Sequence, residues 1–200
     1  MREGKLAEAV EHYRRAIRTY DADARIYTEY AGALFESGKY QEALEAAKAA
    51  WTLTDSGLLK VVSGYWKARA LLGLGDRQSA NAVIDETRAI ADASGGNLVG
   101  LLSMPLVEAD RLDEAEKIYV ELSGREGVLP WLLYLSALPV DRDAAFRSLH
   151  ETIDHPFSGG IVSYIRIASG LDELRADPRW TDVIRHLEAK EAEGAKLSGD

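Results

Sequence analysis

The sequence predicts an all-α protein made of antiparallel helix pairs that stack into one elongated domain. Apolar residues recur with the helical period of about 3.6 residues in almost every long segment, and glycines interrupt the pattern at regular places. The pattern also repeats, because Ala9, Ala43, Ala80 and Ala115 stand in similar surroundings at intervals of 34, 37 and 35 residues. A repeat of this length is typical of helical arrays, whose units stack around a continuous core. We therefore expect negligible strand content.

The first two units match position by position. The matched pairs are Gly4 with Gly38, Leu6 with Tyr40, Val10 with Leu44, Tyr13 with Ala47, Ala16 with Ala50, and Ile17 with Trp51. The apolar stripe of the first unit predicts a helix over residues 5–20. A second helix is expected around residues 27–34, Gly38 makes the turn after it, and a third helix returns over residues 40–50. Alanine at the repeated positions lets paired helices cross closely.

The third unit pairs a helix over about 57–72 with one over 76–93. Asp76 is well placed to cap the second of these helices, because a short side-chain oxygen can accept the free N–H groups of a first turn. Arg77 and Thr87 depart from the repeat pattern, since they replace a large apolar residue and an alanine.

The later units are less regular. Pro105 is expected to kink or shorten the first helix of the fourth unit. In the C-terminal segment, Asp177 can cap a helix and Pro178 can take its first position. The predicted domain covers residues 1–188: a partial first unit (4–23), units over 24–57, 58–94 and 95–126, a degenerate unit (127–156) and a C-terminal cap (157–188), followed by a tail over 189–200 that is expected to fray.

With its helix–turn–helix units of about 34 residues, the chain resembles the tetratricopeptide repeat family. The match is strongest over residues 4–53 and extends to about residue 123. The resemblance implies a right-handed solenoid of antiparallel helix pairs, in which the first helix of each unit lines an inner, concave surface. Proteins of this family bind other proteins. We therefore expect a protein-protein interaction scaffold that holds a peptide or protein segment in its concave groove and has no enzymatic activity.

The same resemblance implies which side chains would contact the partner. They are the inward positions of two first helices: Arg25, Thr28 and Phe35, then Val62, Tyr65, Arg69 and Leu72. Arginine combined with aromatic residues suits a partner of acidic and apolar character. Phe35 and Leu72 have an alternative role of equal weight, which is packing against neighbouring helices. Thr28 and Gly32 stand where family members that clamp a C-terminal carboxylate carry lysine or asparagine, so that binding mode is not expected.

The C-terminal segment supports an alternative function. Residues 171–180 read Leu-Asp-Glu-Leu-Arg-Ala-Asp-Pro-Arg-Trp, and an amphipathic turn follows them. This ending resembles the close of repeat regions in bacterial signalling proteins, such as certain adenylate cyclases and transcriptional regulators. The chain would then be a regulatory or sensing segment of a larger signalling enzyme or transcription factor, and a catalytic or DNA-binding domain encoded upstream would favour this hypothesis.

Composition and charge narrow the choice of partner and compartment. The formal net charge is −9, and most of the acidic excess lies in residues 101–200, which disfavours a nucleic-acid partner. The chain has no cysteine, in keeping with a reducing compartment. It also lacks a run of about 20 apolar residues and an N-terminal secretory signal. We expect a soluble, cytoplasmic protein that does not bind membranes.

No residue pattern predicts catalysis, a metal site or a cofactor. His150 and His155 are five residues apart, a spacing that does not place both imidazoles on one helical face. His12 and His186 are expected to be exposed and without partners. The carboxylate pairs of the sequence lie on solvated helix faces, whereas acid–base catalysis requires a perturbed environment.

The first predicted helix corresponds to the second helix of a complete unit, so its usual partner is missing. Part of its apolar stripe, formed by Leu6, Tyr13 and Ile17, would be left uncovered. Contiguous exposed apolar patches are unusual on monomers. We expect this stripe to be covered either by upstream sequence or by the same end of a second copy, which would give a two-fold homodimer.

Overall fold

The computed structural model describes residues 2–19, 23–155 and 171–198, and all regular structure within these ranges is helical. The prediction of an all-α chain without strands is confirmed for this part of the sequence. The elements are α1 (Arg2–Thr19), α2 (Ala24–Glu36), α3 (Tyr40–Thr52), α4 (Gly57–Gly73), α5 (Arg77–Ala93), the 3₁₀ helix η1 (Asn97–Leu102), α6 (Ser103–Glu108), α7 (Leu112–Ser123), α8 (Pro130–Ala137), α9 (Arg142–Asp154), α11 (Asp172–Arg175) and α12 (Trp180–Ser198).

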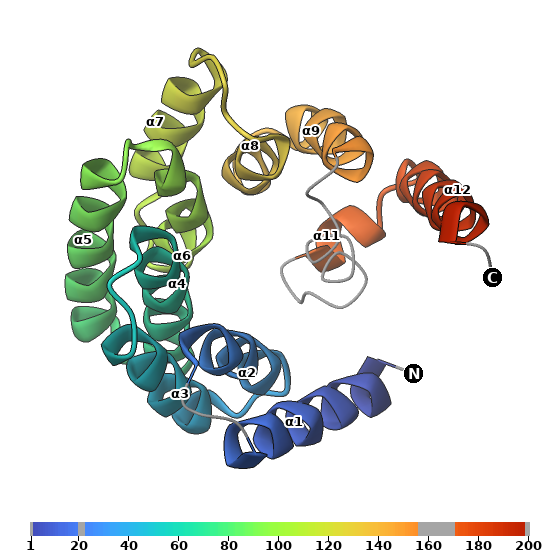
Figure 1. Ribbon diagram of the computed structural model, residues 1–200. Coiled ribbons are helices and arrows are strands. Elements are labelled where there is room, and N and C mark those ends of the chain that lie inside the picture. The colour runs from blue at the N-terminus through green and yellow to red at the C-terminus, as the bar shows by residue number, and fades with distance from the viewer. Residues whose placement is uncertain (1, 20–22, 156–170, 199–200) are drawn as a thin grey trace.

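Helices that follow one another in sequence pack together, and the series forms an arc (Figure 1). The closest pairs are α2 with α3, α3 with α4, α4 with α5, and α8 with α9, and α2 also contacts α4 directly. In Figure 1, α2, α4, α6 and α8 lie on the inner side of the arc, whereas α3, α5 and α7 lie on the outer side. The inner helices are therefore the ones that face the hollow of the arc.

Two apolar cores stabilise the arc. The larger core runs from Val10 in α1 to Leu132 in α8. The smaller core joins α8 and α9 to α11 and α12. Three of the four repeated alanines, Ala43, Ala80 and Ala115, are fully buried where two helices meet, whereas Ala9 is half-buried and packs against the larger core. A larger side chain at these positions would push the paired helices apart.

The glycine turn of the repeat recurs even where the glycine is missing. Gly38 and Gly75 follow α2 and α4 with φ values of 73° and 82°, a region that glycine enters without steric cost. Asp110 takes the same place after α6 with a φ of 61°, and aspartate tolerates this region better than most residues. In each turn the next N–H donates to a carbonyl five residues earlier: Lys39 to Leu34 (2.9 Å), Asp76 to Leu71 (2.9 Å) and Arg111 to Leu106 (2.8 Å).

The predicted helix start at Asp76 agrees with the structure, whereas the one at Asp177 and Pro178 lies slightly too early. Asp76 caps α5, as predicted, by accepting a backbone N–H of the first turn at 3.1 Å. Asp177 accepts the backbone N–H of Arg179 at 3.0 Å, but α12 begins only at Trp180. Pro178 therefore precedes the helix and does not open it.

Two further expectations concern Pro105 and the C-terminal tail. Pro105 lies in the first turn of α6, where its missing N–H costs no helical hydrogen bond, and this helix has only six residues. The helix is short, as expected, but a proline in the first turn is compatible with the helical residues that follow it, so a shortening caused by Pro105 stays a prediction. At the other end, α12 continues to Ser198, into the segment where the sequence predicts fraying. Alanine, glutamate and lysine dominate that segment, and all three favour helix.

Thr87 occupies a position where the repeat pattern has alanine, and Gly64 of α4 makes room for it. Thr87 is fully buried, and its hydroxyl donates to the carbonyl of Val83 at 2.6 Å. A Cβ atom at Gly64 would lie 2.1 Å from that hydroxyl oxygen, far inside van der Waals contact. The absence of a side chain at position 64 therefore lets α4 and α5 approach each other.

Gly64→Ala is expected to lower the free energy of unfolding by about 1–3 kcal/mol, because overpacking at this contact outweighs the better helix propensity of alanine. Urea denaturation followed by circular dichroism measures this change. In a Thr87→Ala background the same glycine substitution should cost clearly less, since the hydroxyl oxygen and the methyl carbon at 2.1 and 2.7 Å are gone and only the Cβ at 3.0 Å remains. Equal losses in the two backgrounds would show that Thr87 is not the reason for the glycine.

Candidate partner-binding surface

The side chains predicted to contact a partner come from α2 and α4, which touch each other on the inner side of the arc (Figure 1). The structure divides them by exposure: Arg25 is exposed, Phe35, Val62 and Leu72 are half-buried, and Thr28, Tyr65 and Arg69 are buried. Only the exposed and half-buried side chains offer surface to a partner.

Arg69 is 4% exposed, and its guanidinium is engaged within the chain. Its Nε lies 2.9 and 3.0 Å from the two carboxylate oxygens of Glu108, and its Nη2 lies 2.6 Å from one of them. Its Nη1 donates to the hydroxyl oxygen of Tyr65 at 2.8 Å. Two-pronged, charge-assisted bonds of this kind are among the strongest hydrogen bonds in proteins. Because Glu108 is the last residue of α6, the ion pair fixes α4 to α6.

Three aromatic rings surround the same guanidinium. The ring centroids of Phe35, Tyr65 and Trp66 lie 4.4, 5.3 and 5.8 Å from its central carbon, which is the arrangement of a cation–π contact. Trp66 in turn lies against Gly32 of α2, where a Cβ atom would come within 2.8 Å of the indole. Gly32 therefore provides space for the tryptophan.

The electrostatics of this cluster keep Tyr65 neutral. Burial raises the pKa of the Tyr65 phenol above its ordinary value, and the carboxylates of Glu108 and Glu36 act in the same direction, while Arg69 opposes them. A neutral phenol retains the oxygen lone pair that accepts the hydrogen bond from Arg69. The buried cation thus has the Glu108 carboxylate as a counter-ion and the Tyr65 hydroxyl as a further acceptor.

Tyr65 and Arg69 do not project from the surface, contrary to the expectation drawn from their spacing. They lie on the inward stripe of α4, but Glu108 and the rings from α2 and α4 enclose the guanidinium. The positive charge expected to attract an acidic partner is neutralised by Glu108. These two side chains therefore hold α2, α4 and α6 together.

Apart from the exposed Arg25, the accessible side chains of the predicted set are apolar. Phe35 and Leu72 pack against the larger core, as the alternative interpretation predicts, and both keep part of their surface in contact with solvent. Val62 behaves in the same way. Glu29 of α2 is exposed near this region, although neighbouring groups partly desolvate its carboxyl and raise its pKa.

The N-terminal end is less open than the sequence predicts. Leu6 is 5% exposed within the single chain, and α1 packs against α2. Leu6 therefore needs no second copy to cover it, which corrects the expected contact at this residue. Tyr13 and Ile17 are half-buried. Their contact with an upstream helix or with a second copy stays a prediction.

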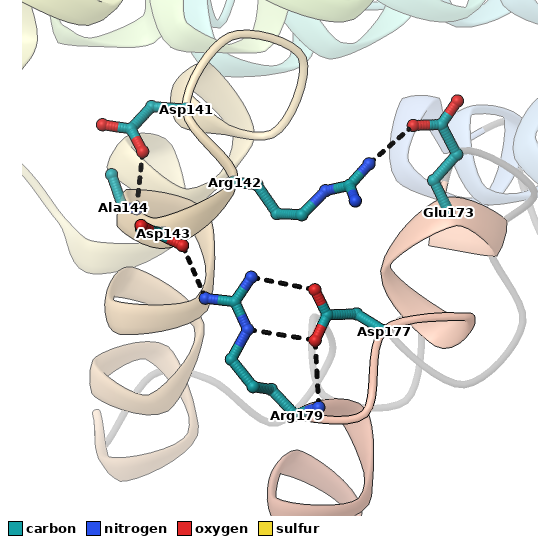
Figure 2. A network of polar contacts seen from close by, with 7 residues as sticks. All are labelled: Asp141, Arg142, Asp143, Ala144, Glu173, Asp177 and Arg179. Atoms are coloured by element: carbon teal, nitrogen blue, oxygen red, sulfur yellow. Dashed lines mark hydrogen bonds and ion pairs between the residues drawn. The ribbon is translucent and has the colours of Figure 1, made fainter.

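Two arginines connect the C-terminal segment to the start of α9 (Figure 2). Arg179 donates to Asp143 at 2.6 Å and to both carboxylate oxygens of Asp177, at 2.8 and 3.0 Å. Arg142 of α9 pairs with Glu173 of α11 at 3.1 Å. The hydrogen bonds from Arg179 lower the pKa of Asp177 to about 2. Sequence spacing does not reveal the bonds between Arg179 and Asp143 or between Arg142 and Glu173, because 36 and 31 residues separate the partners.

His186 has partners, so the expectation that it stands alone is wrong. Its Nδ1 lies 2.9 Å from Nδ1 of His150, and its Nε2 lies 3.0 Å from a carboxylate oxygen of Asp154. The three residues bring α9 and α12 together. Their separation of more than 30 residues along the chain explains why the sequence spacing did not reveal the contact.

The described ranges contain neither a metal-binding group of side chains nor a helix that could span a membrane. No group of three or more histidine, cysteine or acidic side chains within residues 2–19, 23–155 and 171–198 is arranged to hold a metal ion. Within the same ranges, none of the helices combines the length and the apolar character that crossing a bilayer requires.

No protein-family model, curated protein or solved structure gives a significant match to this chain.

Proposed function

We propose that this chain is a protein-protein interaction scaffold that binds a segment of a partner protein along the inner side of its helical arc. In this proposal the helices form a right-handed solenoid of the tetratricopeptide type, and the chain acts in the cytoplasm through binding, without catalysing a reaction. The supporting sequence feature is the repeat of 34 to 37 residues.

The observation that carries the proposal is that three apolar side chains of the inner helices stay half-buried. Phe35, Val62 and Leu72 keep solvent contact while their inner parts pack on the larger core. Side chains of this kind are pre-ordered, so a partner that covers them loses little conformational freedom at the interface. The contact of the Arg69 guanidinium with the Phe35 ring helps to fix the relative positions of α2 and α4.

The proposed partner segment is mainly apolar. Arg69 is already paired with Glu108, and Arg25, which remains exposed, pairs with Asp23 at 3.3 Å. Glu29 adds a negative charge on α2. The partner is therefore selected by apolar contacts more than by acidic groups, and a nucleic acid is disfavoured by the net charge of −9.

Val62→Glu is expected to weaken partner binding by at least about tenfold, because the new carboxylate must lose its hydration when a partner covers this apolar surface. Affinity capture from the source organism identifies candidate partners, and calorimetry with the purified partner measures the affinity. Val120→Glu is the matched control, since Val120 is 68% exposed and belongs to α7, a helix on the outer side of the arc. Equal affinities for both variants, with unchanged helix content, would show that the inner surface does not bind the partner.

A second candidate function is regulation within a larger signalling protein. The C-terminal segment favours it, because α11 and α12 are attached to α9 by ion pairs and histidine contacts around a small apolar core. Such an attachment can respond to conditions without disturbing the larger core.

A further inference from the structure

The contact between α9 and α12 contains two histidines whose hydrogen bond depends on protonation. Nδ1 of His150 lies 2.9 Å from Nδ1 of His186, and the two rings are nearly parallel, with centroids 5.1 Å apart and planes 19° apart. Nε2 of His186 lies 3.0 Å from Asp154, which also pairs with Lys190 at 3.2 Å. We call His150 and His186 the histidine pair.

The histidine pair has room for only one extra proton. A hydrogen bond between two Nδ1 atoms requires one nitrogen that carries a proton and one that offers a lone pair. Two neutral rings meet this requirement, and so does one neutral ring beside one charged ring. Two charged rings do not, because both nitrogens then carry protons at a separation of 2.9 Å and the like charges repel. Two separate, solvated histidines would take up two protons.

The charges around the pair come from the same two helices. Burial, and then the neighbouring His186, lowers the pKa of His150 below its ordinary value, although Asp182 of α12 and Asp154 of α9 act in the opposite direction. The hydrogen bond from His186 holds the pKa of Asp154 below its usual range, so this carboxylate stays ionised in mildly acidic solution. Lys190 adds a positive charge to the same side of the contact.

An apolar contact lies beneath the polar one. Val183 and Leu187 of α12 are almost completely buried in the smaller core, together with Leu149 and Ile153 of α9. Separation of α12 from α9 would expose this apolar surface, whereas the larger core does not include these residues.

We propose that mild acidification releases α12 from α9. The docked histidine pair can bind one extra proton, whereas the two histidines bind two extra protons once the helices separate. The sign follows from proton counting. The released state binds more protons, so docking is complete above the ordinary histidine pKa of about 6.5 and weakens as the pH falls below it. Uptake of one proton on release changes the docking equilibrium by up to about tenfold per pH unit.

Hydrogen exchange of the intact chain tests this proposal. Protection factors for residues 180–193, which remove the intrinsic pH dependence of exchange, are compared at pH 7.5, 6.5 and 5.5. We expect protection of α12 to fall below pH 6.5, by up to about tenfold per pH unit, while protection of α4 and α5 stays constant. Constant protection of α12 over this range would overturn the proposal.

Variants separate the histidine pair from other titrating groups. In His150→Phe, which keeps a ring but cannot be protonated, protection of α12 should no longer fall between pH 6.5 and 5.5. His186→Gln should have the same effect, and this variant is used in place of His150→Phe if the latter fails to fold. His12→Phe, at an exposed position of α1, is the control and should keep the wild-type pH dependence. An unchanged pH dependence in a folded variant of the pair would also overturn the proposal.

Discussion

Arg69→Ala is expected to lower the free energy of unfolding by about 2–4 kcal/mol. The substitution leaves Glu108, whose side chain is 28% exposed, without its cation, and it opens space among three aromatic rings. Removal of one partner from a fully buried ion pair costs about 3–5 kcal/mol, and the partial exposure of Glu108 reduces that figure. Urea denaturation followed by circular dichroism measures the change.

Arg25→Ala provides the matched control, because Arg25 is an exposed arginine on α2 whose ion pair with Asp23 is also at the surface. Its effect on stability should stay within about 0.5 kcal/mol. If both variants unfolded at the same urea concentration as the wild type, Arg69 would not be a structural residue. Its role as a partner contact would then be favoured again.

Val183→Asp is expected to detach α12 while leaving the N-terminal helices folded. Val183 is fully buried in the smaller core, and a charged side chain there costs several kcal/mol in an apolar environment. The larger core contains no residue of α12. Hydrogen exchange should therefore show loss of protection in residues 180–193 and wild-type protection in α2 to α5.

Ala189→Asp introduces the same charge at an exposed position of α12. It should leave the hydrogen-exchange protection of residues 180–193 and of α2 to α5 unchanged. Loss of protection in α2 to α5 together with α12 would contradict the separation of the two cores. It would show that the chain unfolds as one cooperative unit.

The helices could be predicted closely because their signals are local. The repeat of alanines, the glycines at 38 and 75, and the cap at Asp76 each act within a few residues, and the structure confirms their positions. The turn at Asp110 was missed for the opposite reason. It adopts the same left-handed backbone without the glycine that marks the other two turns.

The candidate site could be predicted only in part, because its chemistry depends on contacts between distant residues. Spacing placed Tyr65 and Arg69 on the inward stripe of α4, but Glu108 lies 39 residues after Arg69. A single sequence contains no local sign of that pairing. The contact between His150 and His186, 36 residues apart, was hidden in the same way. Local patterns determine which face a side chain lies on, and tertiary packing determines whether it stays accessible.

Gly64 and Thr87 show how departures from a repeat can compensate each other. Thr87 alone looks like a weak match to the pattern, because its side chain is larger than that of alanine. The hydroxyl fits only because position 64 carries no Cβ. The smaller side chain at position 64 of α4 therefore compensates for the larger one at position 87 of α5, and the two helices stay paired.

The central claim, that a partner binds along the inner side of the arc, is tested most directly by site-specific photo-crosslinking in the source organism. Benzoylphenylalanine is placed at Val62 in one sample and at Val120 in another, and the crosslinked species are identified by mass spectrometry. We expect position 62 to capture a discrete partner segment, rich in apolar residues, that position 120 does not capture. Capture of the same partner from position 120, with none from position 62, would contradict the claim.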